Sequence, residues 1–213
     1  MVASLQPQLK LSKKIRLCII QMKKKEKKIT KLNISNCRNL RPYKFTEYVG
    51  RILWTIISPF FQYSPRPFFA WRRFLLRLFG AQIGKEAHID PSACIYLPWN
   101  LILGDEASIG EKALIYNLGI ITIGDRATIS QRAHLCAGTH NYSDPSMPLL
   151  RLPIKIGAQA WICADVFVGP NIKIGESAVV GAASVVVKDV PPWKIFAGNP
   201  ARFIKKRILV KNF

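Results

Sequence analysis

Residues 83–191 repeat with a period of six, and this period restricts the fold more than any other feature of the sequence. Apolar residues recur at every sixth position within successive blocks: Ile83, Ile89 and Ile95; Leu103, Ile109, Ile115 and Ile121; Ile123, Ile129 and Leu135; Ile156, Ile162, Val168, Ile174, Val180 and Val186. A small residue usually follows four positions later: Ala87, Ala93, Ala107, Ala113, Ala127, Ala133, Ala160, Ala178 and Ser184. An α-helix repeats every 3.6 residues and a plain strand every two, so neither produces this pattern.

Such a repeat predicts a mainly β protein, a parallel β-helix. Each six-residue unit would form a short strand and a corner, and three units would close a triangular coil of about 18 residues. We expect the apolar residue to point inward and the small residue to let the chain turn. Stacked coils would pair their strands in parallel, about 4.8 Å apart. The phasing gives about five coils, which start at Ile83, Leu103, Ile123, Ile156 and Ile174.

One segment interrupts the repeat. Residues 141–155 contain three prolines and separate His140 from the coil that starts at Ile156. A β-helix accommodates such a segment as a loop that leaves the prism, and loops on rigid scaffolds often carry function.

Both ends of the chain differ from the repeat. Residues 1–44 contain a dense run of lysines and predict a basic, solvated tail. Residues 192–213 predict a short basic helix, with Asn199 as its N-cap and Pro200 as its first residue.

Residues 45–82 predict helices rich in aromatic side chains. Their charge-free run is shorter than the about 20 residues that span a bilayer and contains Pro59, which excludes a transmembrane helix. Between Pro67 and Gly80 the helical period separates arginines from large apolar residues: Arg72, Arg73 and Arg77 against Phe68, Trp71, Phe74, Leu75 and Leu78. This composition is typical of a helix lying in a membrane interface. The alternative is a helix that packs on its own protein with its arginines in water.

The charge of the chain is concentrated at its ends. The 32 Lys and Arg and 12 Asp and Glu give a net charge of +20, which suggests a polyanionic partner. Residues 1–50 carry 13 basic and 2 acidic side chains, and residues 51–82 carry five basic and no acidic ones. Residues 83–191, by contrast, carry eight basic and ten acidic side chains. A nucleic-acid-binding module would spread basic residues over a folded face, so specific nucleic-acid binding is disfavoured. The tail alone could still bind nucleic acid nonspecifically.

Cysteines and histidines show no metal-binding or secretory pattern. Five cysteines without a CxxC pair predict reduced thiols in a cytoplasmic protein, and the apolar run 17–20 is too short for a signal peptide. His134 and His140 lie six residues apart, hence on successive sides of one coil, so no metal site is expected. No GxSxG or P-loop motif appears.

Several motifs make the resemblance to a known family specific. They are Thr-His at 139–140, Ala-Trp-Ile at 160–162, Gly-Ala-Ala-Ser-Val-Val-Val-Lys-Asp-Val-Pro-Pro at 181–192 and Ala-Gly-Asn-Pro-Ala-Arg at 197–202. With the repeat they resemble the left-handed β-helix sugar O-acetyltransferases, and the segments 135–145 and 161–170 resemble the colanic acid biosynthesis acetyltransferase branch. The likeness covers roughly residues 36–207. It implies a left-handed coil, acetyl-CoA as donor, and a homotrimer with sites between neighbouring chains.

The resemblance also implies roles for individual residues. His140 matches the catalytic histidine, and imidazole can take the proton of an attacking hydroxyl near neutral pH. Asn117 matches a residue that contacts the acceptor; the alternative is an asparagine that suits a tight turn. Six positions match contacts to the cofactor arm, its pantetheine or its phosphates: Trp161, Ala164, Ala182, Lys188, Arg202 and Lys205.

The predicted function is acetyl transfer from acetyl-CoA to a sugar hydroxyl in surface polysaccharide biosynthesis. The acceptor would be a sugar or a lipid-linked glycan, and the protein would be cytoplasmic and peripheral at the inner membrane. An amino sugar or serine as acceptor is the alternative within the same chemistry. A basic binding module and a purely structural β-helix are the alternatives outside it.

Overall fold

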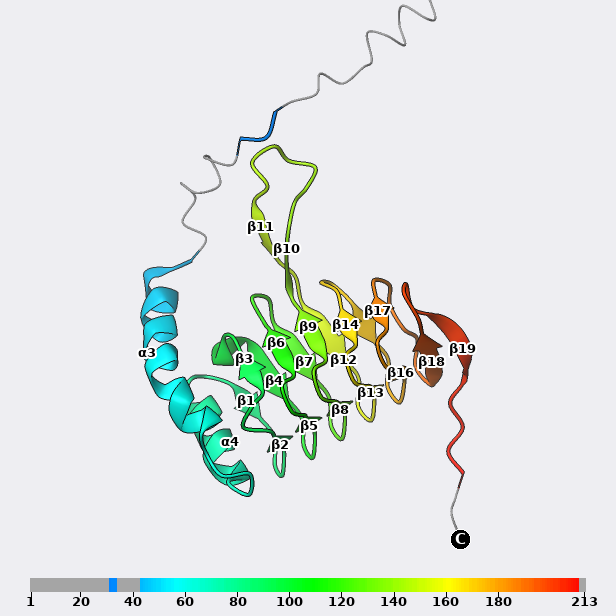
Figure 1. Cartoon of the computed structure of the whole chain (residues 1–213), viewed down its shortest axis with the longest axis horizontal. Coiled ribbons are helices and arrows are strands. Elements are labelled where there is room, and N and C mark those ends of the chain that lie inside the picture. Colours follow the sequence, from blue (N-terminus) through cyan, green and yellow to red (C-terminus); the bar gives the residue numbers. More distant parts are fainter. Residues whose placement is uncertain (1–30, 34–42, 211–213) are drawn as a thin grey trace, which may run out of the picture.

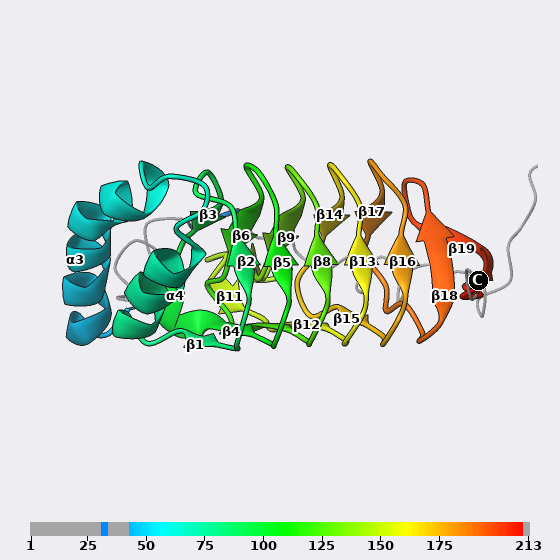
Figure 2. The same ribbon diagram turned by 90° about the horizontal axis from the view of Figure 1, so that it is seen from below.

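A computed structural model describes residues 31–33 and 43–210. Two helices, α3 (Phe45–Gln62) and α4 (Phe69–Leu78), precede a triangular solenoid whose axis runs along the length of the molecule (Figures 1 and 2). The predicted tail of residues 1–44 lies outside the described residues except for positions 31–33, 43 and 44.

The solenoid has three faces, whose strands are parallel except for β19 at the end of face 2. Face 1 contains β1 (Gln82–Ile83), β4 (Leu101–Leu103), β7 (Ile121–Ile123), β12 (Ile154–Ile156) and β15 (Lys173–Ile174). Face 2 contains β2 (His88–Ile89), β5 (Ser108–Ile109), β8 (Thr128–Ile129), β13 (Trp161–Ile162), β16 (Val179–Val180), β18 (Lys194–Ala197) and β19 (Arg202–Lys206). Face 3 contains β3 (Cys94–Ile95), β6 (Leu114–Tyr116), β9 (His134–Cys136), β14 (Phe167–Val168) and β17 (Val185–Val186). A 3₁₀ turn, Pro98–Asn100, joins β3 to β4.

The apolar residues of the repeat fill the prism as predicted. In each strand the repeat residue is buried and pairs with its equivalent one coil away, as Ile109 does with Ile129 and Ile162 with Val180. Successive coils therefore superpose their branched side chains in one continuous apolar column. The prediction of a parallel β-helix is confirmed.

The corners differ in detail from the prediction. The small residues of the first corner, between faces 1 and 2, are completely or almost completely buried and fill the angle of the prism: Ala87, Ala107, Ala127, Ala160 and Ala178. The turn itself is made by the residue before each of them, which adopts a positive φ: Glu86, Glu106, Arg126, Gln159 and Ser177. The small residue therefore serves packing, and its predecessor carries the left-handed backbone.

Glycine is required at the first corner by the stacking of the coils. A Cβ atom on any of five glycines there would lie within 3.0 Å of the chain stacked on it: Gly84, Gly104, Gly124, Gly157 and Gly175. The second corner, between faces 2 and 3, is more open, and the equivalent position there also accepts Asp90, Ser130 and Cys163. Glycine thus occupies every position of this kind at the first corner, and only some at the second, such as Gly110 and Gly181.

The arginines of α4 face the solenoid, contrary to the prediction that a helix packed on its own protein would keep them in water. Arg72 is fully buried and donates from Nε to the carbonyl oxygen of Ile89 at 2.7 Å. Arg73 donates to Ala87 O at 3.1 Å, and Arg77 to the carbonyl oxygens of Ile83 and Gly84 at 2.7 and 3.0 Å. No coil precedes the first one, so its outer carbonyls need donors, and the guanidinium groups supply them.

Most of the large apolar residues of both helices face outward, while Leu75 and Leu76 of α4 are buried beside Arg72. Large apolar residues of α3, α4 and the turn between them are exposed: Phe45, Tyr48, Val49, Ile52, Leu53, Ile56, Phe60, Tyr63, Phe68, Trp71, Phe74 and Leu78. On the opposite side of α3, Trp54 is buried and donates from Nε1 to Ile95 O at 2.9 Å. Within the described residues, neither helix combines the length and hydropathy needed to cross a membrane.

The prediction of a C-terminal helix is wrong. Asn199 and Pro200 are joined by a cis peptide, and the chain returns as β19, antiparallel to β18, instead of entering a helix. The open edge of the last strand on face 2 requires backbone partners, which a helix could not provide. Residues 207–210 that follow are not helical either.

Candidate active site

His140 ends the first strand of a hairpin that leaves the prism after the third coil. The strands β10 (Gly138–His140) and β11 (Leu149–Arg151) pair antiparallel, so that His140 lies opposite Leu149 (Figure 1). The predicted loop 141–155 contains the turn and second strand of this hairpin and the first residues of β12. Its base is fixed because a Cβ at Gly138 would meet the side chains of Leu118 and Tyr116. The hairpin holds an exposed histidine beside the prism.

The imidazole of His140 is oriented by the hairpin itself. Its Nδ1 atom lies 2.6 Å from the carbonyl oxygen of Met147. A carbonyl oxygen can only accept, so Nδ1 carries the hydrogen and Nε2 carries the lone pair in the neutral ring. A neutral, oriented histidine with Nε2 as its basic atom can serve as a general base.

Asn117 lies inside the fold. It is fully buried, its Oδ1 accepts from the backbone N–H of Leu97 at 2.8 Å, and its Nδ2 donates to the carbonyl oxygen of Leu97 at 2.5 Å. Both polar atoms of the amide therefore link two coils, and the structure supports the alternative of a structural asparagine. A contact between Asn117 and an acceptor stays a prediction.

Trp161 borders a hollow on face 2. Its ring is half exposed, and Nε1 donates to Ser130 Oγ at 2.9 Å. The hollow has a volume of about 700 Å³ and also includes Arg126 and Arg207 in its lining. Sequence reasoning missed these two arginines, because Arg126 lies in a corner of the repeat and Arg207 beyond the motifs. Arg207 is held in place by the carbonyl oxygens of Gln159 and Ser177, at 2.9 and 3.1 Å.

Ala164 and Ala182 occupy equivalent places at the second corner, one coil apart. Neither backbone N–H donates to another residue in the described part of the chain, whereas Ala183 N donates to Ala164 O at 2.9 Å. Short side chains leave these two amides accessible along the edge of the prism. Free, stacked amides are the groups that an extended chain with carbonyl oxygens could bind.

The three predicted basic contacts lie at the last coil. Lys188 is exposed after β17, and Arg202 and Lys205 are exposed on β19. Ala201, next to Arg202, donates from its backbone N–H to Val185 O of β17 at 2.8 Å, so both segments belong to the same end of the solenoid. The structure thus gathers these cations at one end.

The predicted residues do not form one site within a single chain. His140 projects from the edge between faces 3 and 1, whereas Ala164 and Ala182 lie on the edge between faces 2 and 3. Trp161 is on face 2. His140 and the three residues predicted to contact the cofactor arm and its pantetheine therefore lie apart on the prism, whereas Lys188, between β17 and the bridge of Val190 to Ile174, lies on the same edge as His140.

His134 belongs to an aromatic column on face 3. Its ring lies edge-on to Tyr116 and Phe167, with centroids 6.5 and 5.2 Å away. Burial lowers its pKa, which keeps the imidazole neutral. Among residues 31–33 and 43–210, no three His, Cys, Asp or Glu side chains gather in a position to hold a metal ion.

Comparisons with known proteins identify the family. No protein-family model matches the chain. The chain is 44% identical over 158 residues to a protein of Escherichia coli (strain K12) with the provisional name colanic acid biosynthesis acetyltransferase WcaF, and this match covers 74% of the chain and 87% of that protein. A maltose O-acetyltransferase structure from Clostridium difficile 630 superposes with a TM-score of 0.70 at 26% identity, covering 78% of this chain and 90% of that one.

A structure of galactoside acetyltransferase in complex with coenzyme A shows the same fold. It superposes with a TM-score of 0.71 at 24% identity, over 82% of this chain and 91% of that one. The prediction of a left-handed β-helix with hexapeptide repeats is confirmed by these relatives and by the stacked coils. The identity to the Escherichia coli protein over most of both chains shows that this chain belongs to the hexapeptide-repeat acetyltransferase family and is an acetyltransferase.

Proposed function

We propose that the chain transfers an acetyl group from acetyl-CoA to a sugar hydroxyl during the biosynthesis of a surface polysaccharide, with His140 as the general base. The observation that carries the proposal is the contact of His140 Nδ1 with Met147 O, which leaves Nε2 as the basic atom on an exposed hairpin. The similarity to a colanic acid biosynthesis protein and to a maltose O-acetyltransferase supports the choice of acceptor.

The proposed reaction is a direct transfer. The acceptor oxygen attacks the carbonyl carbon of the thioester, a C–O bond forms, and the C–S bond breaks. Nε2 of His140 takes the hydroxyl proton as the oxygen attacks and gives it to the departing CoA sulfur. The carbonyl of Met147 stabilises the imidazolium that forms between these two steps, because it accepts the hydrogen bond from Nδ1.

Acetyl-CoA would bind along the second corner and the end of the solenoid. The free amides of Ala164 and Ala182 suit the carbonyl oxygens of pantetheine, and Trp161 lies beside this edge. Lys188, Arg202 and Lys205 would bind its phosphates, since cations are what a polyphosphate tail requires.

We infer that the active unit is a homotrimer. His140 lies on another edge of the prism than Ala164 and Ala182, which would bind the pantetheine, so a neighbouring chain would complete each site. Sedimentation should give a mass three times that of one chain. Co-expressed His140→Ala and Trp161→Ala chains should regain activity that neither has alone, because some mixed interfaces would combine an intact histidine with an intact tryptophan.

The test of His140 compares two histidine variants. With purified chain, acetyl-CoA and an accepted sugar, His140→Ala should lower turnover by about 100- to 10,000-fold, the usual contribution of a general base. His88→Ala is the matched control, because His88 is an exposed histidine on face 2. Wild-type turnover in His140→Ala would refute the assignment. Mass spectrometry of surface glycans from cells with and without the gene would identify the acceptor by its missing acetyl group.

We further propose that the protein is cytoplasmic and that the outward apolar side of α3 and α4 lies on the anionic surface of the inner membrane. Its exposed aromatic and branched residues follow a basic segment, residues 1–44, which carries 13 basic and one acidic side chain. Ile52→Glu with Ile56→Glu should abolish flotation with anionic vesicles. Ile208→Glu, an exposed residue at the other end of the solenoid, is the control. Flotation that is unchanged in the double variant would contradict this role.

A further inference from the structure

Among the described residues, two nitrogen atoms of one guanidinium group between α3 and the solenoid have no hydrogen-bond partner. The Cζ atom of Arg51 lies 3.8 Å from the centre of the Tyr43 ring and 5.2 Å from that of Tyr96. Its Nε and Nη2 atoms are buried, and neither has a partner within the described part of the chain. Buried donors normally have acceptors, because the water they lose must be replaced. The described residues therefore supply no acceptor for these two atoms of Arg51.

Another arginine of the same chain shows which group this pair of atoms binds. Arg132 donates from Nε and Nη2 to the two carboxylate oxygens of Asp165, both at 2.7 Å. The two donors point in parallel along one edge of the guanidinium plane, which matches the spacing of oxygens in a carboxylate or phosphate. The same two atoms of Arg51, Nε and Nη2, make no hydrogen bond within the described part of the chain.

Glu47, an acid that is influenced by the charge of Arg51, is already bound elsewhere. Glu47 accepts from Arg151 Nη1 at 2.8 Å and from the backbone N–H of Lys44 at 3.0 Å. Burial alone would raise the pKa of Glu47, but the bonds from Arg151 and Lys44 and the charge of Arg51 lower it, so the carboxylate is ionised. It balances one of the two arginines, and a positive charge remains at Arg51.

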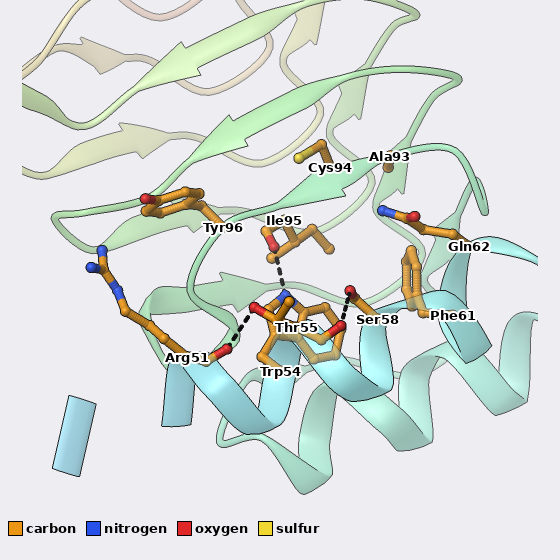
Figure 3. A pocket seen from close by; sticks show the side chains of 10 residues that line it. All are labelled: Arg51, Trp54, Thr55, Ser58, Phe61, Gln62, Ala93, Cys94, Ile95 and Tyr96. Atoms are coloured by element: carbon orange, nitrogen blue, oxygen red, sulfur yellow. Dashed lines mark hydrogen bonds between the residues drawn. The ribbon is translucent and has the colours of Figure 1, made fainter. Parts of the chain in front are cut away.

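A cavity of about 230 Å³ opens beside Arg51, between α3 and β3. Figure 3 shows the guanidinium group at one end of it, next to the Tyr96 ring, with the hydroxyl groups of Thr55 and Ser58 along the helix side. These hydroxyls donate to carbonyls of their own helix and keep their acceptor positions. The volume is below the roughly 300–1,000 Å³ of drug-sized pockets, and so suits a single sugar ring or phosphate group.

The cavity is connected to the hairpin that carries His140 through a chain of ring contacts. Tyr96 packs on Tyr116 with centroids 5.0 Å apart, and Tyr116 lies against the base of the hairpin at Gly138. On the other side, the Cζ atom of Arg151, which pairs with Gly138, lies 4.4 Å from the Tyr43 ring that also covers Arg51. His140 is two residues further along the strand, about 7 Å.

We propose that Arg51 binds an oxyanion of the acceptor, so that the acceptor is an anionic sugar with a phosphate or carboxylate group. This inference rests on the proposed function, since the ligand at the foot of the hairpin is taken to be the acceptor. It narrows the substrate class from sugars in general to charged ones. The phosphate and the carboxylate share the chemistry of paired oxygens, and the experiment separates them.

The experiment measures KM at saturating acetyl-CoA for three acceptors, glucose, glucose 1-phosphate and glucuronic acid, and for their galactose counterparts. Wild-type chain should have a lower KM for an anionic sugar than for the neutral one. Arg51→Gln should raise the KM for the anionic sugar by about tenfold or more and leave that for the neutral sugar unchanged. For the anionic sugar, the KM of Arg51→Lys should lie between those of the wild type and Arg51→Gln, because lysine keeps the charge and loses the paired donors. Arg66→Gln is the control, since that arginine is exposed.

Calorimetric titration of the full chain with each anionic sugar supplies a readout that does not depend on turnover. Binding that is lost in Arg51→Gln and kept in Arg66→Gln would support the proposal, and the tighter of the two ligands would identify phosphate or carboxylate as the source. Equal KM changes for neutral and anionic sugars, or the absence of any anionic binding, would overturn it. A chain that binds the anion but releases no CoA with any sugar would refute the proposed function instead.

Discussion

Replacing Arg72 with methionine should detach the helices from the solenoid. The side chain of Arg72 is fully buried and donates to Ile89 O at 2.7 Å, Pro65 O at 2.8 Å, Arg66 O at 2.5 Å and Ser64 Oγ at 2.9 Å. Methionine fills a similar volume but leaves three carbonyl oxygens without these donors.

The size of the effect follows from the partners. Each buried acceptor left without a donor costs about 1–3 kcal/mol. Ile89 O is buried, while the other two carbonyls are partly exposed and would regain water. Burial also lowers the pKa of Arg72, which shows that its charge is desolvated, and methionine removes this cost. We therefore expect a net loss of about 2–4 kcal/mol, well below three full penalties.

Denaturant unfolding would measure the loss of unfolding free energy. All variants should be compared at one protein concentration, since the stability of the proposed trimer would depend on it. Hydrogen exchange should accelerate first in α3, α4 and the first coil, because each coil of a solenoid contacts only its neighbours. Arg66→Met is the control: its side chain is exposed, its nearest carboxylate oxygen is 3.5 Å away, and such pairs contribute about 0–1 kcal/mol. Equal stability of Arg72→Met and Arg66→Met would refute the reasoning.

Three further predictions concern the cofactor, pH and the corners. Charge reversal at Lys188 and Arg202 should raise the KM for acetyl-CoA more than it lowers turnover, and steady-state kinetics with an unchanged KM would exclude them from phosphate binding. Burial lowers the pKa of His134, so on acidification the unfolded chain binds a proton there before the folded chain does, and the free energy of unfolding should fall as the pH drops below about 6.5. Unfolding measured over this pH range should show a smaller decrease in that free energy for His134→Phe than for the wild type. An identical decrease would contradict this reasoning. A Cβ at Gly124 would lie 2.6 Å from the next coil but at Gly181 3.0 Å from a side chain, so thermal unfolding should show Gly124→Ala to be the more destabilised, by about 1–3 kcal/mol.

The prism could be predicted from the sequence because one residue in six controls it. Each repeat residue points to the same axis, and burial of a branched side chain at every unit leaves no other geometry for the chain. The position of His140 was also predictable, because the segment 141–155 cannot continue the repeat. The C-terminal helix was not, because the Asn199–Pro200 pair satisfies a capping rule locally while the open edge of β18 decides the structure.

The orientation of α4 could not be read from its period. A helical wheel separates arginines from apolar residues, but it does not say which side meets the protein. Apolar sides usually face inward, yet the first coil presents carbonyl oxygens that only donors can satisfy. The same limit applies to Asn117, whose partner is twenty residues away, and to Arg51 and Arg151, which meet at Tyr43 only after the chain has folded.

The inward arginines link the two proposals about α3. Because α4 covers the first coil with its arginines and with Leu75 and Leu76, the other large apolar residues of both helices remain free for a lipid surface. Arg51 and the exposed Ile52 are neighbours on α3, so an oxyanion bound at Arg51 would lie within about one helix diameter, 10–12 Å, of that surface. A sugar attached to lipid through a phosphate carries its anion at this depth. The membrane-facing side chains and the anion site would then serve one acceptor, although each is tested by its own variants.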